Sequence, residues 1–394
     1  MSALSIKSLV SFGDLTDEDI DEILELADGM ASAIGFDDDE RISNVQPLDR
    51  ILATAFYEPS TRTRLSFEAA MLRLGGQVVG FASADVSSAY KGESVADTAR
   101  VLSGYCDVLV MRHPLAGAAK VAAKGATVPF INAGDGPREH PTQTLTDLFC
   151  INRELDTLSD LTIGLCGDLK YGRTVHSLAP VMARRGCEIV CIAPDELKMP
   201  EKYMVEVEEL GGSRPEETDD LEAAIADLDV LYMTRIQRER FDSQEDYERV
   251  AGVYVLTPDI MEKAKDEMRV LHPLPRVDEI DPAVDEDPRA AYFRQAAGGV
   301  PVRMALISLL LDLPQFSLPP KSIGLDSVGR SRQKEDVTEP APPPEPQWVT
   351  GAGPCRNKKC IAGPESNEPL EQKFYEDAGG NTVCYYCEQP LETD

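Results

Sequence analysis

Residues 51–81 read ILATAFYEPSTRTRLSFEAAMLRLGGQVVGF, a stretch that contains one strand–helix–strand unit. Its two short apolar runs, 51–56 and 77–81, predict buried strands, whereas the apolar spacing of 63–74 is typical of an amphipathic helix. Short strands that alternate with helices build parallel sheets with helices on both faces. The stretch therefore predicts an α/β fold.

The same alternation continues from about residue 50 to 310. Further strands are expected at 107–111, 127–131, 161–166, 188–193, 228–233, 253–256 and 269–271, and further helices at 93–105, 142–153 and 174–185. This many strands predict two doubly wound parallel-sheet domains, residues 1–145 and 146–298. A last helix, about 299–312, is expected to pack back on the first domain.

The pattern stops beyond this helix. Residues 313–347 contain the run VTEPAPPPEP and predict an extended, semi-rigid linker. The remaining residues, 348–394, are too few to fold on apolar burial alone, so we expect a small β module that is stabilised by a metal.

The chain is acidic and has ordinary apolar content. It has 39 Lys and Arg against 69 Asp and Glu, a formal net charge of −30, and 42% of its residues are hydrophobic. Such a surface repels nucleic acid and anionic lipid, so we expect neither as a partner. The first residues show no signal-peptide pattern, and no run approaches the roughly 20 apolar residues that span a bilayer. We therefore expect a cytoplasmic protein without membrane contact.

The nine cysteines fall into two groups. Those within apolar segments are expected to be small core residues: Cys106, Cys150, Cys166, Cys187 and Cys191. The others follow the spacing C-x4-C-x23-C-x2-C: Cys355, Cys360, Cys384 and Cys387. Two close thiolate pairs separated by a loop are typical of a structural zinc site with no open coordination position. The alternative, a pair of disulfides, is rare in cytosolic chains.

Polar side chains follow most of the predicted strands. In open parallel sheets, ligands bind beyond the carboxyl ends of the strands. The residues at these positions include Ser60 to Arg64, Arg112, His113, His140, Gln143, Arg173, His176, Arg235, Gln237 and the segment from His272 to Arg276, and they include all four histidines of the chain. The pattern predicts a basic binding site to which both domains contribute.

The segment Ser60-Thr61-Arg62-Thr63-Arg64 opens a predicted helix. Free backbone N–H groups and the positive end of the helix dipole form an anion site, hydroxyl groups add donors, and an Arg fork binds phosphate bidentately. A capped helix with two solvated arginines is the alternative, but the arginines at neighbouring strand ends favour a phosphate site. Arg173 and Arg235, on the second domain, suit a dicarboxylate.

Several segments together resemble the catalytic chain of the aspartate carbamoyltransferases: PSTRTRLSFE, KGES, MRHP, HPTQ, DLKYGRTVHS, TRIQRER and HPLPRVDEI. The resemblance covers about residues 5–312, and the TRIQ and HPLPR segments resemble the aspartate enzymes more than the ornithine enzymes. It implies that carbamoyl phosphate and L-aspartate give N-carbamoyl-L-aspartate and phosphate, the second step of de novo pyrimidine biosynthesis. The amine attacks directly, with no covalent intermediate and no catalytic cofactor.

The resemblance also implies residue roles. The phosphate is bound by Ser60, Thr61, Arg62, Thr63 and Arg112, the carbonyl oxygen by Thr63, Arg112 and His140, and the carbamoyl amino group by Gln143. The carboxylates of aspartate are bound by Arg173, Arg235 and Gln237, while Leu274 and Pro275 supply backbone carbonyls. Ser87 and Lys91 reach carbamoyl phosphate, and Lys91 also aspartate, in the site of a neighbouring subunit, because the family forms homotrimers with shared sites.

The CRNKKC and CYYCE segments are similar to the zinc domain of the regulatory chain of bacterial aspartate carbamoyltransferases, which joins opposed trimers. We therefore expect the linker to carry the module to a neighbouring chain and to allow a dimer of trimers. Residues 313–347 are too few for the nucleotide-binding domain of that regulatory chain. ATP and CTP are accordingly expected to have little effect through the tail.

One local departure is PREH at 137–140, where family members often have uncharged residues before the histidine. We interpret the Arg138–Glu139 pair as a surface feature. Three other readings stay open: a carbamoyltransferase for ornithine or another amino acid, a catalytically idle scaffold, and a nucleic-acid-binding tail with Lys358 and Lys359 as its basic pair.

Overall fold

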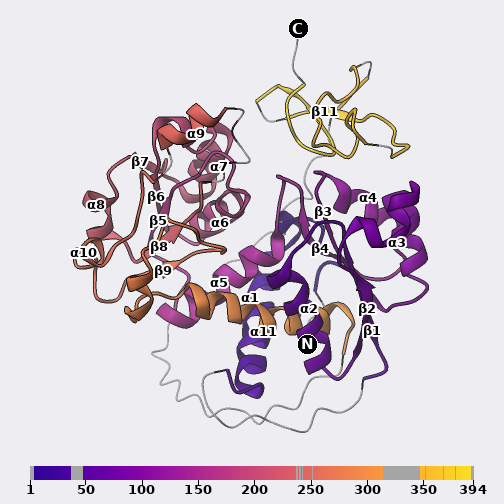
Figure 1. The fold of residues 1–394 in the computed structure, drawn as a ribbon, viewed down its shortest axis with the longest axis horizontal. Coiled ribbons are helices and arrows are strands. Elements are labelled where there is room, and N and C mark those ends of the chain that lie inside the picture. The colour runs from indigo at the N-terminus through magenta and orange to yellow at the C-terminus, as the bar shows by residue number, and fades with distance from the viewer. Residues whose placement is uncertain are drawn as a thin grey trace, which may run out of the picture.

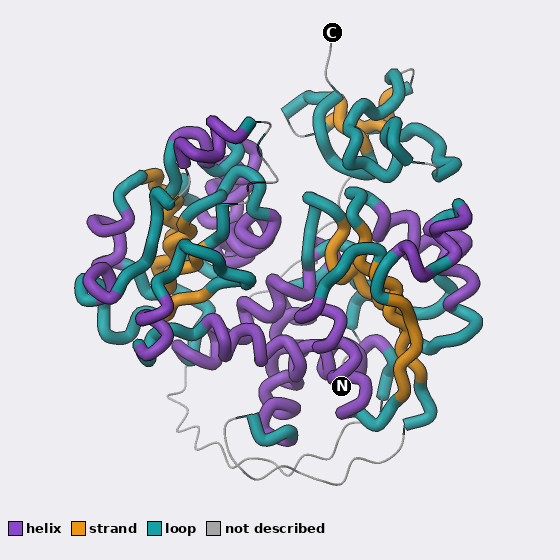
Figure 2. The backbone as a smooth tube through the Cα atoms, viewed as in Figure 1, coloured by secondary structure: helices purple, strands orange, loops and turns teal. Residues whose placement is uncertain are grey.

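A computed structural model describes residues 4–36, 48–236, 238, 241, 243–250, 252–313, 347–350, 352–366, 368–377 and 379–391. Two parallel sheets and a small module with its own sheet form the molecule (Figures 1 and 2). The predicted fold class is therefore confirmed. Within the described residues, no helix is both long enough and apolar enough to cross a membrane, and the expected cytoplasmic location stays a prediction.

The first sheet has the strand order β2-β1-β3-β4, and all of its pairs are parallel. Its strands are β1 (Ile51–Phe56), β2 (Gln77–Phe81), β3 (Val108–His113) and β4 (Phe130–Asp135). Alternate residues along these strands enter different apolar clusters: Leu52 and Val108 pack on one face, and Ala53 and Leu109 on the other. The period of two in the sequence thus separates two helical layers.

The second sheet has the order β7-β6-β5-β8-β9 and is also parallel. Its strands are β5 (Thr162–Cys166), β6 (Glu188–Ile192), β7 (Glu216–Thr218), β8 (Val230–Met233) and β9 (Arg269–Leu271). The predicted strand at 253–256 is wrong, since only Leu256 forms an isolated bridge, with Ile280. We did not predict β7, because its sequence, EET, is polar and sits at the sheet edge.

The helices fill the layers around these sheets (Figure 1). They are α1 (Asp17–Ala33), α2 (Thr61–Arg73), α3 (Val95–Leu102), α4 (Ala118–Gly125), α5 (Pro141–Leu155), α6 (Arg173–Arg184), α7 (Glu201–Gly211), α8 (Leu221–Ala224), α9 (Gln244–Val250), α10 (Pro258–Met261) and α11 (Tyr292–Leu310). Helix α11 packs on α1, α2 and α5. Because α5 and α11 both contribute to the largest apolar cluster, that cluster continues from the first sheet to the second.

The C-terminal module contains the antiparallel strands β10 (Trp348–Val349), β11 (Phe374–Glu376) and β12 (Thr382–Cys384). Its buried residues, among them Ile361 and Phe374, share one cluster with the α3–α4 side of the first sheet. The structure thus seats the module on the first domain of its own chain, whereas its delivery to a neighbouring chain stays a prediction. Most of the predicted linker lies outside the described residues.

Candidate active site and metal centre

A cleft of about 720 Å³ lies at the carboxyl ends of both sheets. Doubly wound sheets bind ligands where the strand order reverses. Those points are β1/β3 in the first sheet and β5/β8 in the second, and the segments after all four strands line the cleft. Most of the predicted site residues line it: Ser60, Thr61, Arg62, Thr63, Arg112, His140, Gln143, Arg173, Arg235, Leu274 and Pro275.

Helix α2 begins at Thr61, with Ser60 as its N-cap residue, so its first turn lies at the cleft. Two arginines stand beside it. Partial loss of surrounding water and the charge of Arg112 lower the pKa of Arg62, although the residue remains exposed at the cleft. Arg112 is held by Glu58, whose Oε1 accepts from Arg112 Nε at 2.6 Å. Two close cations at a helix N-terminus form a strong anion site.

His140 precedes α5 and is buried. Its Nε2 lies 3.3 Å from Thr63 Oγ1, and its Nδ1 lies 3.4 Å from Thr142 Oγ1. Burial, with the nearby charges of Arg173 and Arg112, lowers the pKa of His140 well below its ordinary value. The imidazole is therefore neutral at physiological pH and can donate one hydrogen bond to a substrate oxygen.

Gly134 marks the point at which the two domains meet. A β-carbon added to it would lie 3.5 Å from Arg112 Nη1, from Arg173 Nη2 and from His140 Cδ2. Its φ of +118° also favours glycine. Arg173 Nη1 further donates to the carbonyl oxygen of Gly136. A cation of the second domain thus reaches the donors of the first.

Gln143 is positioned by a buried carboxylate that sequence reasoning missed. Asp147, one turn further along α5, accepts from Gln143 Nε2 at 2.7 Å, from Gln295 Nε2 at 2.6 Å and from Tyr232 Oη at 2.9 Å. Burial, despite these donors, raises the pKa of Asp147 to about 7. The network ties α5 to β8 and α11 and fixes the amide of Gln143.

Helix α11 supplies another cleft residue that we did not predict, the buried Arg303. Its Nη1 donates to the carbonyl oxygen of Gly299 at 2.7 Å, and its guanidinium lies 4.9 Å from the centre of the Phe67 ring. Burial lowers its pKa to about 10. The sequence does contain a signal for Arg303, since it is the single charge inside the apolar run VPVRMALISLL. A charged side chain is rarely buried unless it is paired or has a functional role.

His272 and Glu279 support the segment that contains Leu274 and Pro275. His272 Nδ1 accepts from the Leu274 backbone N–H at 2.7 Å, and His272 Nε2 donates to Glu279 Oε1 at 2.6 Å. Leu274 has a φ of +53°, a conformation that a leucine adopts only under tertiary constraint. This support fixes where the Leu274 and Pro275 carbonyls lie.

The His272–Glu279 bond predicts a dependence of stability on pH. Burial alone would raise the pKa of Glu279, but the bonds from His272 and from the Val277 N–H hold it at about 2, against 4.5 for an unperturbed Glu. A carboxyl group whose pKa is lower in the folded than in the unfolded state stabilises the fold fully above pH 4.5. That stabilisation, about 3 kcal/mol, is lost as the pH falls from 4.5 towards 2. We expect Glu279→Gln to lower the thermal stability at pH 6, with the difference from wild type shrinking below pH 4.5. A difference that stays constant from pH 6 to pH 3 would contradict this role.

Three predicted site residues are not brought into this cleft. Lys91 ends a short 3-10 turn, Ser88–Lys91, and Ser87 caps the start of that turn. Neither residue is among the described residues that line the cleft. Gln237 lies outside the described residues. Of the four histidines, His140 and His272 line the cleft, whereas His113 packs against Tyr57 and His176 stacks on Tyr203.

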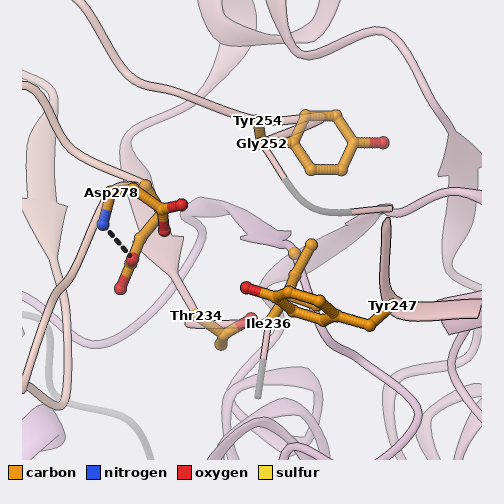
Figure 3. A pocket seen from close by; sticks show the side chains of 8 residues that line it. Thr234, Ile236, Tyr247, Gly252, Tyr254 and Asp278 are labelled. Atoms are coloured by element: carbon orange, nitrogen blue, oxygen red, sulfur yellow. Dashed lines mark hydrogen bonds between the residues drawn. The ribbon is translucent and has the colours of Figure 1, made fainter. Parts of the chain in front are cut away.

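A second pocket lies beside β5 and β8, between Thr234, Tyr247 and Tyr254 (Figure 3). Its volume is about 10 Å³. That is room for about one water molecule, so this pocket cannot hold a substrate.

The predicted zinc ligands converge in the module. The Sγ atoms of Cys355, Cys360, Cys384 and Cys387 all lie within 4.8 Å of one another, with Cys355–Cys387 at 3.8 Å and Cys360–Cys384 at 3.9 Å. A tetrahedral ZnS4 site with bonds of about 2.3 Å places its sulfurs about 3.8 Å apart, whereas a disulfide needs about 2.05 Å. The donor set therefore fits a closed structural zinc site. Of the core cysteines, four are buried as expected, but Cys106 is only partly buried.

The reading of Arg138–Glu139 as a surface feature is wrong. The Arg138 side chain is 6% exposed, and its Nη2 donates to Glu139 Oε1 at 2.8 Å and to Glu388 Oε1 at 3.0 Å. Glu139 in turn accepts from the Phe12 N–H at 2.7 Å. Because Glu388 follows the zinc ligand Cys387, this partly buried network links the module to the loop that ends at His140.

Comparisons with known proteins agree with this geometry. Family models match residues 7–153 (aspartate/ornithine carbamoyltransferase, carbamoyl-P binding domain), 159–310 (aspartate/ornithine carbamoyltransferase, Asp/Orn binding domain) and 348–394 (aspartate carbamoyltransferase regulatory chain, metal binding domain). The aspartate carbamoyltransferase catalytic subunit of Thermococcus gammatolerans is 52% identical over 307 residues, covering 78% of this chain and 98% of that protein. That of Methanopyrus kandleri is 50% identical over 312 residues, covering 79% and 99%.

Solved structures are similar as well. The catalytic subunit of M. jannaschii aspartate transcarbamoylase, 45% identical, covers 78% of this chain and 98% of its own with a TM-score of 0.72. Aspartate transcarbamoylase of Trypanosoma cruzi in complex with N-(phosphonacetyl)-L-aspartic acid, 41% identical, covers 76% and 94% with a TM-score of 0.70. The resemblance drawn from the sequence is thus confirmed, both for the main body and for the metal-binding module.

Proposed function

The chain belongs to the aspartate/ornithine carbamoyltransferase family and transfers the carbamoyl group of carbamoyl phosphate to L-aspartate, and we propose how its residues divide this work. The observation that carries the proposal is the convergence of Arg112, His140 and Arg173 around Gly134, because it brings together both halves of a site for two anions.

Carbamoyl phosphate occupies the first-domain half of the cleft. Its phosphate binds at the start of α2, to Ser60, Thr61, Arg62 and Thr63, and to Arg112. Thr63, Arg112 and neutral His140 donate to the carbonyl oxygen, and Gln143, oriented by Asp147, holds the carbamoyl amino group. Negative charge grows on that oxygen in the transition state, and each aimed donor lowers the barrier by about 3 kcal/mol.

L-aspartate occupies the second-domain half. Arg173 and Arg235 bind its two carboxylates, and the Leu274 and Pro275 carbonyls accept from its amine. We also assign Gln237 here, on the sequence alone. The amine then attacks the carbonyl carbon, a C–N bond forms, and the C–O bond to phosphate breaks. The departing phosphate takes the amine proton, so the reaction needs no cofactor. The four thiolates of the module leave no open position for substrate on a bound zinc, whose role is structural.

The working enzyme is a homotrimer with shared sites, and the metal-binding module allows two trimers to associate. The position of Ser87 and Lys91 supports the shared site, because neither is among the described residues that line the cleft of their own chain. A loop that holds Lys91 outside its own cleft suits donation of that lysine to a neighbour.

The proposal is tested with a panel of acceptors and labelled carbamoyl phosphate. We expect carbamoylation of L-aspartate and none of L-ornithine, because an arginine that binds the side-chain carboxylate of aspartate repels the side-chain ammonium of ornithine. Arg235→Ala should raise the KM for aspartate by about a hundredfold or more, because a charge-assisted bidentate pair is lost, and leave the affinity for carbamoyl phosphate nearly unchanged. Transfer to ornithine, or a selective loss of carbamoyl phosphate binding in Arg235→Ala, would contradict the assignment.

A further inference from the structure

The metal-binding module is joined to the catalytic body beside Arg112. The Ala116 N–H donates to the carbonyl oxygen of Lys359 at 2.9 Å, and the Ile361 N–H donates to that of Ala116 at 2.9 Å. These two bonds form a short parallel bridge between the segment after β3 and the first zinc-ligand loop. The bridge places the backbone of Lys359 beside Ala116, which lies four residues after Arg112.

The neighbouring glycine shows how tightly the module is seated. Gly117 has a φ of +86°, and a β-carbon added to it would lie 2.7 Å from Tyr386 Cβ and from the Tyr386 carbonyl oxygen. Such a distance excludes any side chain at position 117. The module therefore packs closely against the backbone of the first domain at Gly117.

A partly buried charge network adds a second point of contact between the module and the first domain. Glu388 Oε1 accepts from Lys120 Nζ at 2.7 Å and from Arg138 Nη2 at 3.0 Å, while Lys120 Nζ also donates to the Tyr385 carbonyl oxygen at 2.7 Å. Loss of the Glu388 carboxylate would leave the Arg138 guanidinium, which is 6% exposed, with one fewer ion-pair partner, and the removal of one partner from a buried charge is costly. The two contacts together hold the zinc-ligand loop in one place.

Lys359 itself lines the substrate cleft, together with Pro114, Gly136 and Pro137. It is exposed, and within the described part of the chain no carboxylate lies at ion-pair distance from its ammonium group. Its neighbour Lys358 differs in both respects, since it does not line the cleft and lies 3.9 Å from Glu365. One lysine of the pair is therefore engaged by the module, and the other stands at the cleft.

We propose that Lys359 binds the phosphate of incoming carbamoyl phosphate, so that the metal-binding module supplies part of the active site. The inference rests on the proposed carbamoyl phosphate site at the start of α2. A protein with a net charge of −30 repels a substrate anion, and a local cation at the cleft offsets that repulsion. The module thereby contributes to substrate binding as well as to assembly.

The test compares Lys359→Ala, Lys359→Arg and Lys358→Ala in the full chain. Lys359→Ala should raise the KM for carbamoyl phosphate by about three- to fivefold and weaken calorimetric binding of inorganic phosphate equally, because an exposed charge pair has this strength. Its kcat should change by less than about twofold, since the contact is made equally in the ground and transition states. Lys359→Arg should restore the wild-type values, and Lys358→Ala should behave as wild type.

Zinc content equal to that of wild type verifies that the module stays folded in each variant. Lys359→Ala with unchanged phosphate affinity would overturn the inference, as would an equal loss in Lys358→Ala. Arg62→Ala serves as the reference for the site itself. If it loses phosphate affinity while Lys359→Ala does not, the inference fails and the proposed site stands; if Arg62→Ala also binds phosphate normally, the proposed site fails as well.

Discussion

Arg62→Ala is expected to lower kcat/KM for carbamoyl phosphate by about a hundredfold to a thousandfold while the protein stays folded. Arg62 stands in the first turn of α2, where its guanidinium faces no competing ion pair in the described structure, and Arg112 is close enough to lower its pKa. The fold does not depend on it, because the side chain is exposed at the cleft. Steady-state kinetics at fixed saturating aspartate measures the loss.

The chain offers a matched control in the same segment. Arg64 lies two residues further along α2, pairs with Glu68 at 3.6 Å and does not line the cleft. Arg64→Ala removes the same charge from the same helix, yet it should change kcat/KM by less than about threefold, as expected for a surface pair. Equal losses in the two variants would mean that net charge matters, and the specific phosphate contact of Arg62 would be refuted.

The second large effect is a recovery of activity in a mixture. Lys91→Ala and Arg62→Ala should each be nearly inactive alone. When the two are denatured, mixed and reassembled, a site that takes its Arg62 from one chain and its Lys91 from the next is complete. With random assembly of trimers, about one quarter of the sites regain both residues, so activity should rise to about one quarter of wild type.

The control is each variant denatured and reassembled alone, which should stay inactive. Ser87 precedes the turn that ends at Lys91. A Ser87→Ala variant should therefore complement Arg62→Ala in the same way. A mixture no more active than its parents would show that Lys91 acts within its own chain, and the shared site would have to be abandoned.

Local patterns in the sequence were enough to predict much of this protein. The strands β1 and β2 were predicted with their observed bounds, because each is a short apolar run between turn residues. Strand β1 is buried as expected, whereas β2 lies at the sheet edge and is largely exposed. The cysteine spacing predicted a metal site, since ligand pairs that are close in sequence are close in space in any fold of the module. The resemblance supplied the residue roles. The strand at 253–256 failed, because an apolar run also occurs wherever a loop covers a core.

Only the tertiary structure decided which distant side chains meet. The proximity of Arg112, Arg173 and His140 to Gly134 depends on how α5 and α11 join the two sheets, and no local pattern encodes that packing. The same holds for Arg303, which reaches the cleft from α11, and for Lys359, which reaches it from the metal-binding module. Sequence periodicity indicates which face of an element is buried. The partner of that face is set by close packing and by charge pairs between distant segments, as between the buried Arg138 side chain and the partly buried Glu388.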